Sequence, residues 1–242
     1  MRTDFEAESF AAEIKEVARG SGADLVGIVS AASIDASPRV WVGWEIQEYT
    51  KKTTEILPDS ESVVVVGIHV WDDMLELAIR KGGRWVYPGY FPLGVPVQAA
   101  VHHLEKKGYK AIPLHSRVSM KRLAQLAGFG NFGKNALIVN PTFGPWIRFD
   151  GVLTNAVMKA DSPIDTDLCG DCEECIRACP VGALTPYKVD NVRCLVGIHI
   201  SGKEISEHAE ELERYEPSFT NNSHLMCVEC QKACKYGREV RR

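Results

Sequence analysis

The sequence lacks cysteine over its first two thirds, and none of its eight cysteines precedes residue 169. It also lacks an apolar run near the roughly 20 residues that a helix needs to cross a bilayer. Its first residues, "MRTDFEAESF", lack the basic region and apolar core of a signal peptide. We therefore expect a cytoplasmic protein without a membrane partner. Because the cytoplasm keeps thiols reduced, eight clustered cysteines indicate metal binding or catalysis rather than disulfides.

A basic excess is missing as well. Residues 1–150 hold 17 Lys and Arg against 17 Asp and Glu, and residues 151–242 hold 11 against 15. Nucleic-acid-binding domains normally carry a basic excess, so we expect no nucleic-acid partner. Between Asp161 and Glu174 lie six carboxylates and no base. This run is either a solvated loop or a docking face for a basic redox protein.

The abrupt rise in cysteine content predicts two domains, an α/β cofactor-binding domain over residues 1–160 and a second domain over residues 161–242. The β-branched run "SVVVVGIHV" (62–70) is typical of a strand buried on both faces. Local patterns predict the other elements, which are helices over 4–20, 42–57, 95–108 and 119–128, strands over 24–30 and 109–114, and a hairpin of 135–140 with 145–158. Such a mixture predicts an α+β fold, in the form of an α/β sandwich.

The cysteine spacing of "CGDCEECIRACP" (169–180) is the one used by two-cluster bacterial ferredoxins. In these proteins the first three cysteines of the run bind one [4Fe–4S] cluster and the fourth binds the other. A second half-motif, "CVECQKAC" (227–234), follows, and Cys194 lies between the two. Eight thiolates are what two such clusters require.

The crossed pattern assigns the eight cysteines to two ligand sets. The first set is Cys169, Cys172, Cys175 and Cys234, and the second set is Cys179, Cys194, Cys227 and Cys230. The alternative is a pair of zinc sites, since Cys-x2-Cys pairs also bind zinc. Zinc does not account for the whole run from Cys169 to Pro180.

The stretch "GFGNFGKN" (128–135) contains the Gly-x-Gly-x-x-Gly spacing of a dinucleotide-binding loop, in Gly128, Gly130 and Gly133. That fingerprint needs a strand before it and a helix after it. Here a predicted helix precedes it and a β-rich run follows, which argues against NAD. The glycines instead allow a close approach to a flat ligand, with Lys134 and Asn135 contacting its polar groups, or they form a tight loop that needs positive φ.

The blocks "LAGFGNFGKNALIVNPTFGPWIRFDGVLTNAVM", "CGDCEECIRACPVGAL" and "MCVECQKAC" together resemble the epoxyqueuosine reductase family and its distant relatives, the corrinoid-dependent reductive dehalogenases. The resemblance implies cobalamin in an N-terminal domain similar to the nitroreductase fold. It further implies a two-cluster ferredoxin-like domain that feeds electrons to the cobalt, with the eight cysteines as ligands. The loop from Gly128 to Asn135 would lie near the corrinoid.

Where the family places its acidic proton donor, this sequence has "LHSRVSMKR" (114–122), without a carboxylate. His115 is a candidate acid because imidazole titrates near neutrality. Further candidates, by chemistry alone, are Tyr87, Tyr90, His102 and His103. We also expect neither the family's C-terminal helical-repeat domain nor the dehalogenases' twin-arginine leader.

We hypothesise a reductase that passes single electrons through two [4Fe–4S] clusters to cobalamin, or to flavin as an alternative, and acts on a small molecule. The electron donor would be a low-potential ferredoxin or flavodoxin. The alternative function is a non-catalytic electron-transfer protein that reduces a partner protein or its corrinoid.

Overall fold

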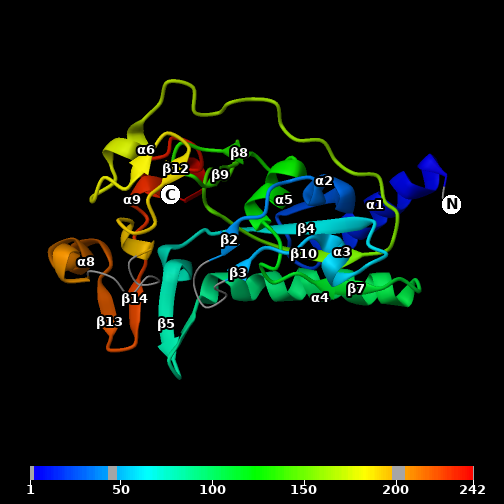
Figure 1. Ribbon diagram of the computed structural model, residues 1–242, viewed down its shortest axis with the longest axis horizontal. Coiled ribbons are helices and arrows are strands. Elements are labelled where there is room, and N and C mark those ends of the chain that lie inside the picture. The colour runs from blue at the N-terminus through cyan, green and yellow to red at the C-terminus, as the bar shows by residue number, and fades with distance from the viewer. Residues whose placement is uncertain (1–2, 43–47, 198–204, 242) are drawn as a thin grey trace.

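At the centre of the computed structural model, which describes residues 3–42, 48–197 and 205–241, lies a four-stranded antiparallel sheet (Figure 1). Its strands, in spatial order, are β1 (Leu25–Ser30), β4 (Ser62–His69), β10 (Ile147–Thr154) and β7 (Ala111–Pro113). Strand β4 is buried along its whole length. The prediction of a doubly buried strand over residues 62–70 is thus confirmed.

Helices cover both faces of this sheet. Because side chains alternate along a strand, Val64 and Val66 of β4 pack against α1 and α4, whereas Val63 and Val65 pack against the opposite layer. The helices of the first layer are α1 (Asp4–Gly20) and α4 (Gly94–Lys106), and those of the second are α2 (Ala31–Asp35), α3 (Thr53–Ile56) and α5 (Met120–Leu126). The predicted α/β sandwich is confirmed.

A second four-stranded sheet joins residues 77–86 to residues 218–225. Its strands, in spatial order, are β13 (Ser218–Thr220), β14 (Ser223–Leu225), β5 (Leu77–Lys81) and β6 (Arg84–Val86). Strand β14 pairs antiparallel with β5, so segments on either side of the predicted boundary near residue 160 share this sheet. That boundary stays a prediction.

The acidic segment that leads into the cysteine-rich region runs as a long irregular connection along the outside of the molecule (Figure 1). It is fastened to the sandwich at Asp161, whose carboxylate accepts hydrogen bonds from Lys15 Nζ (2.6 Å) and from the Ile28 N–H (2.7 Å). Further along, the Asn131 side chain donates to the carbonyls of Ile164 (2.7 Å) and Thr166 (2.9 Å). The segment is therefore anchored at several points and is not simply a solvated loop.

Two local predictions were wrong. Residues 42–57 do not form one helix, because strands β2 (Trp41–Val42) and β3 (Glu48–Tyr49) precede the short α3, and residues 43–47 lie outside the described part. The predicted hairpin of 135–140 with 145–158 is replaced by a hairpin of β8 (Asn131–Phe132) with β9 (Ile138–Val139). Strand β10 pairs instead with β4 and β7.

The remaining elements are short. They are η1 (Asp73–Glu76), η2 (Pro88–Leu93), α6 (Glu174–Arg177), β11 (Leu184–Thr185), β12 (Lys188–Val189), η3 (Ile205–His208), α8 (Ala209–Tyr215), α9 (Glu229–Lys232) and η4 (Glu239–Arg241). Within the described ranges, no helix has the length and apolar character needed to span a bilayer.

Candidate metal centre

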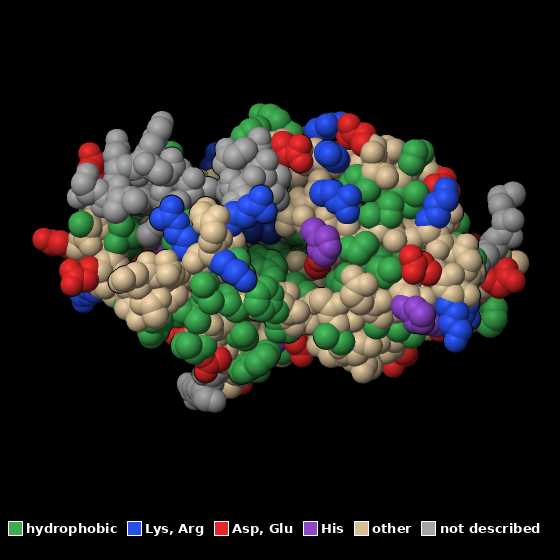
Figure 2. All heavy atoms as spheres, turned by 90° about the horizontal axis from the view of Figure 1, so that it is seen from below, with side chains coloured by type: hydrophobic (Ala, Val, Ile, Leu, Met, Phe, Trp, Pro, Cys, Tyr) green, Lys and Arg blue, Asp and Glu red, His purple; other side chains and the backbone are tan. Residues whose placement is uncertain are grey.

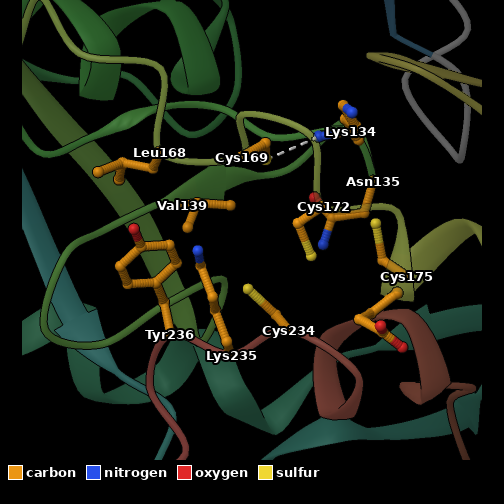
Figure 3. Close-up of a pocket in the computed structure, with 11 residues that line it drawn as sticks. Lys134, Asn135, Val139, Leu168, Cys169, Cys172, Cys175, Cys234, Lys235 and Tyr236 are labelled. Carbon is orange, nitrogen blue, oxygen red and sulfur yellow. Dashed lines mark hydrogen bonds between the residues drawn. The ribbon is translucent and has the colours of Figure 1, made fainter.

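The first predicted ligand set surrounds a single pocket (Figure 3). Its cysteines are Cys169, Cys172, Cys175 and Cys234, which come from the loop before α6, from α6 itself and from the turn after α9. Helices α6 and α9 pack against each other. This packing brings together thiols that are some 60 positions apart in sequence, as the crossed pattern requires. Their role as ligands remains a prediction.

The second predicted set lies beside the first. Cys179, Cys194 and Cys227 pack against an apolar cluster that includes Leu195 and Leu212. Cys230 interacts electrostatically with all three of these cysteines and also with Cys175 of the first set. The two sets are therefore neighbours, so an electron could pass directly from one to the other.

Burial suppresses ionisation of these thiols. Desolvation raises the pKa of Cys175 to about 11 and that of Cys227 to about 12, and it also raises the pKa of Cys230. A lone thiol at such a position stays protonated at neutral pH. Iron would have to displace these protons, since the thiolate is the ligand.

Backbone N–H groups point at several of the sulfurs. The N–H of Lys134 donates to Cys169 Sγ at 3.4 Å, and the N–H of Ala183 donates to Cys179 Sγ at 3.2 Å. Such donors stabilise negative charge on sulfur and are one of the means by which proteins tune iron–sulfur clusters. Both sets therefore have the surroundings that a thiolate cluster needs.

The glycine-rich loop borders the first pocket rather than a separate cofactor cleft. Lys134 and Asn135 both line that pocket (Figure 3). Gly128 has φ of +74°, and a Cβ there would lie 2.6 Å from the Ser162 carbonyl oxygen. At Gly130, a Cβ would lie 2.1 Å from the Val139 carbonyl oxygen. The glycines thus serve close backbone packing, while their predicted contact with a cofactor remains untested.

Another pair of glycines allows the chain after the second half-motif (227–234) to pack closely against the turn before β10. Gly144, in the turn before β10, has φ of +59°, and a Cβ there would lie 2.2 Å from the Tyr236 carbonyl oxygen. Gly237 has φ of +80°, and its Cβ would lie 2.4 Å from the Phe143 carbonyl oxygen. This contact holds the chain just after Cys234, where ferredoxin motifs normally have proline. The sequence offered no signal for it beyond the two glycines.

We expect Gly144→Ala to destabilise the fold and to reduce iron binding at the first set. The left-handed conformation alone costs an alanine about 1–2 kcal/mol, and the collision with Tyr236 adds to it. Gly82→Ala is the matched control, because Gly82 also has φ of +59° but has nothing within 4 Å of its Cβ position. Melting temperature and iron content should fall further for Gly144→Ala than for Gly82→Ala. Equal losses in the two variants would contradict a role for the Tyr236 contact.

The candidate acid His115 lies in an exposed turn at the edge of the sheet. His115 and Ser116 both have left-handed backbone, with φ of +44° and +65°. The Asp150 carboxylate contacts the imidazole Nδ1 (3.0 Å) and accepts from the backbone N–H of His115 (3.0 Å). This Asp–His pair could not be found from sequence, because its members are 35 positions apart. Of the other two candidate histidines, both on α4, His102 is exposed and His103 pairs with Glu13 at 3.0 Å.

Sequence reasoning also missed a buried ion pair. The Arg148 guanidinium, on β10, donates to the carboxylate of Glu76, whose side chain is only 1% exposed. The Arg148 Cζ lies 5.6 Å from the centre of the Tyr90 ring. Lys121, in the first turn of α5, donates from Nζ to the Ala136 carbonyl (2.8 Å). Lys121 and Tyr90 are exposed, so a cation and an aromatic ring reach the surface beside this buried pair.

Comparison with known proteins supports the iron–sulfur interpretation. Residues 168–237 match the family model described as "4Fe-4S double cluster binding domain", which favours two clusters over zinc. The epoxyqueuosine reductase of Gloeobacter violaceus is 27% identical in an alignment of 253 positions, gaps included. The alignment covers 96% of this chain and 77% of that protein. The Listeria monocytogenes enzyme of the same name is 32% identical over 116 residues, 48% of this chain and 29% of that one. The chain is epoxyqueuosine reductase-like.

Solved structures show the same fold. A crystal structure of epoxyqueuosine reductase with an epoxyqueuosine-modified tRNA stem loop matches with a TM-score of 0.71 at 20% identity, over 95% of this chain and 66% of that one. A reductive dehalogenase, whose structure suggests a mechanism for B12-dependent dehalogenation, matches with a TM-score of 0.65 at 21% identity, over all of this chain and 34% of that one. The epoxyqueuosine reductase-like chain thus spans 66% of the length of the epoxyqueuosine reductase in that structure and 34% of the length of the dehalogenase. Because one neighbour is solved with a tRNA stem loop, the expectation against nucleic acid finds no support here.

Proposed function

We propose that this chain is a cytoplasmic reductase in which two [4Fe–4S] clusters pass single electrons to a corrinoid for a reaction of the epoxyqueuosine reductase type. The observation that carries the proposal is the gathering of eight thiols into two neighbouring sets, within a segment that matches a double-cluster domain. Residues 161–242 would hold the clusters and residues 1–160 the corrinoid. A low-potential ferredoxin or flavodoxin would supply the electrons.

The donor set fits iron–sulfur clusters. Four thiols surround the first pocket, and the buried Nδ2 of Asn135, which also lines it, has no hydrogen-bond partner in the described part of the chain. Lys121 bonds to the Ala136 carbonyl at the end of the glycine-rich loop and lies within electrostatic range of Cys194 and Cys230, so both sets lie near the surface where a corrinoid would be reduced.

The surface beside Lys121 suits a corrinoid. Lys121 is exposed to solvent, and desolvation by the surrounding protein together with the charge of Arg148 lowers its pKa. Figure 2 shows a hollow on the underside of the molecule, with Lys and Arg side chains in and around it. Lys121 and Arg148 could contact the polar edge of a corrinoid, and Tyr90 its flat face. A bound corrinoid would supply the cobalt that carries the reduction.

His115 is the proton source that we propose for this reaction. Asp150 holds Nδ1 and stabilises the doubly protonated imidazolium form, in which Nε2–H carries the proton that would be given to a substrate. Two consecutive left-handed residues are costly and are often found at functional sites. The pair replaces the acidic residue that is absent from residues 114–122.

Metal analysis and absorbance of protein purified without oxygen test the proposal. We expect about eight irons per chain, and cobalt with a corrinoid band after incubation with cobalamin. Iron without any corrinoid would favour the alternative, an electron-transfer protein that reduces a partner. A flavin spectrum would point to flavin in place of cobalamin, and zinc in place of iron would contradict the cluster assignment. An epoxyqueuosine-modified tRNA stem loop, as found with the relative, is the first substrate to assay.

A further inference from the structure

Asn135 presents an unused hydrogen-bond donor to the first cysteine pocket. Its side chain is 5% exposed and lines the pocket together with the four cysteines. Its Oδ1 accepts the N–H of Leu137 at 3.2 Å, which fixes the orientation of the amide. Nδ2, on the opposite side of the amide group, has no partner among the described residues. In Figure 3 the Asn135 amide points into the pocket, toward the cysteine sulfurs.

The loop around Asn135 is built to hold this orientation. Ala136 is in the left-handed region, with φ of +59°, and its carbonyl is held by Lys121 Nζ at 2.8 Å. A Cβ at Gly133 would lie 2.9 Å from Asn135 Oδ1 and 2.5 Å from a Val139 methyl carbon, so only glycine leaves room for the amide. A strained residue held by a lysine is evidence that the surrounding structure determines this conformation.

A buried amide N–H without a partner costs free energy comparable to a lost hydrogen bond. Sulfur atoms carrying negative charge are the acceptors that the pocket offers. The neighbouring Lys134 N–H already donates to Cys169 Sγ, so this wall of the pocket presents two donors side by side. Donors of this kind stabilise the reduced, more negative form of a cluster and raise its reduction potential.

We propose that Asn135 is a positioning residue whose side-chain amide donates a hydrogen bond to a sulfur of the cluster held by Cys169, Cys172, Cys175 and Cys234, and that this bond raises the potential of that cluster. The inference rests on the proposed function for the presence of the cluster. Its consequence is that the cluster nearest the glycine-rich loop is easier to reduce than it would be without this bond. The glycine-rich loop is thus a tuning element of an iron–sulfur centre.

Redox titration of the intact protein, followed by the EPR signals of its two clusters, tests this role. Asn135→Leu removes the donor at similar volume, and Asn135→Asp keeps an acceptor for Leu137 but replaces the donor by a negative charge. We expect one cluster to shift to a more negative potential in both variants, and further in Asn135→Asp, while the other cluster stays in place. A tenfold change in the reduction equilibrium corresponds to about 59 mV for one electron.

Asn155→Leu is the matched control, because it makes the same change at an amide whose Nδ2 donates to Asp59 (3.0 Å) and does not line the cysteine pocket. It should move the potential less than either Asn135 variant. Unchanged potentials in both Asn135 variants, a positive shift, or equal shifts of both clusters would overturn the inference. Iron content separates the two proposals. Failure to bind iron in the unmodified protein refutes the proposed function, whereas normal iron with unmoved potentials refutes only the role of Asn135.

Discussion

Removing Cys175 and Cys234 together is expected to halve the iron content, from about eight to about four atoms per chain. These two cysteines line the same pocket, although 58 residues separate them in sequence. Each alanine removes one of the four thiolates of a single cluster, and a cluster with two ligands missing should be lost. The other four thiols remain to hold the second cluster. Iron analysis of the Cys175→Ala/Cys234→Ala variant, purified without oxygen, measures the result.

The sharper comparison is with Cys175→Ala/Cys179→Ala. These two cysteines are neighbours in sequence but belong to different sets in the crossed pattern, so this variant should lose both clusters and nearly all its iron. An uncrossed arrangement, with the run from Cys169 to Cys179 binding a single cluster, predicts the reverse outcome for the two variants. The two double substitutions therefore distinguish the two arrangements by iron content alone.

Features that depend on local composition could be predicted from the sequence. The burial of β4 follows from an uninterrupted β-branched run, and the site of metal chemistry follows from cysteine spacing. Residues 42–57 have helical spacing, but tertiary contacts override it. Asp35 accepts hydrogen bonds from the Thr53 N–H (2.6 Å) and hydroxyl (2.9 Å), which fixes the start of the short α3. A contact across 18 residues is not visible in a local pattern.

The position of the glycine-rich loop was also beyond sequence reasoning. Its glycines predicted close backbone approach, and the structure has such approaches at Gly128 and Gly130. The neighbours of the loop come from a segment 35 residues further along the chain, where Cys169 Sγ accepts the Lys134 N–H. A local pattern cannot indicate that contact. The same holds for His115, whose partner Asp150 lies on β10. The spacing of cysteines predicts which residues of one motif bind a metal. Contacts between residues far apart in sequence depend on the tertiary fold and cannot be predicted from spacing.

The ion pair of Arg148 with Glu76 links β10 of the central sheet to η1, which leads into the second sheet, so its loss should have a large effect. Glu76 is almost wholly buried, and its backbone carbonyl accepts the N–H of Met226, next to Cys227. Arg148→Met leaves the carboxylate buried without its counter-charge, which typically costs about 3–5 kcal/mol. For a chain of this size we expect the melting temperature to fall by roughly 6–20 °C.

Two further variants separate the buried charge from general disruption. In Arg148→Met/Glu76→Leu no unpaired charge is left, so much of the lost stability should return. Arg19→Met breaks the exposed pair with Glu16 (2.8 Å) on α1 and should change stability by no more than about 0.5 kcal/mol. If the double variant were as unstable as Arg148→Met, packing of the arginine stem rather than its charge would be responsible. Recovery in the double variant would instead show that the pair is dispensable for stability. That result would favour retention of Arg148 for its charge beside Lys121 and the second cysteine set.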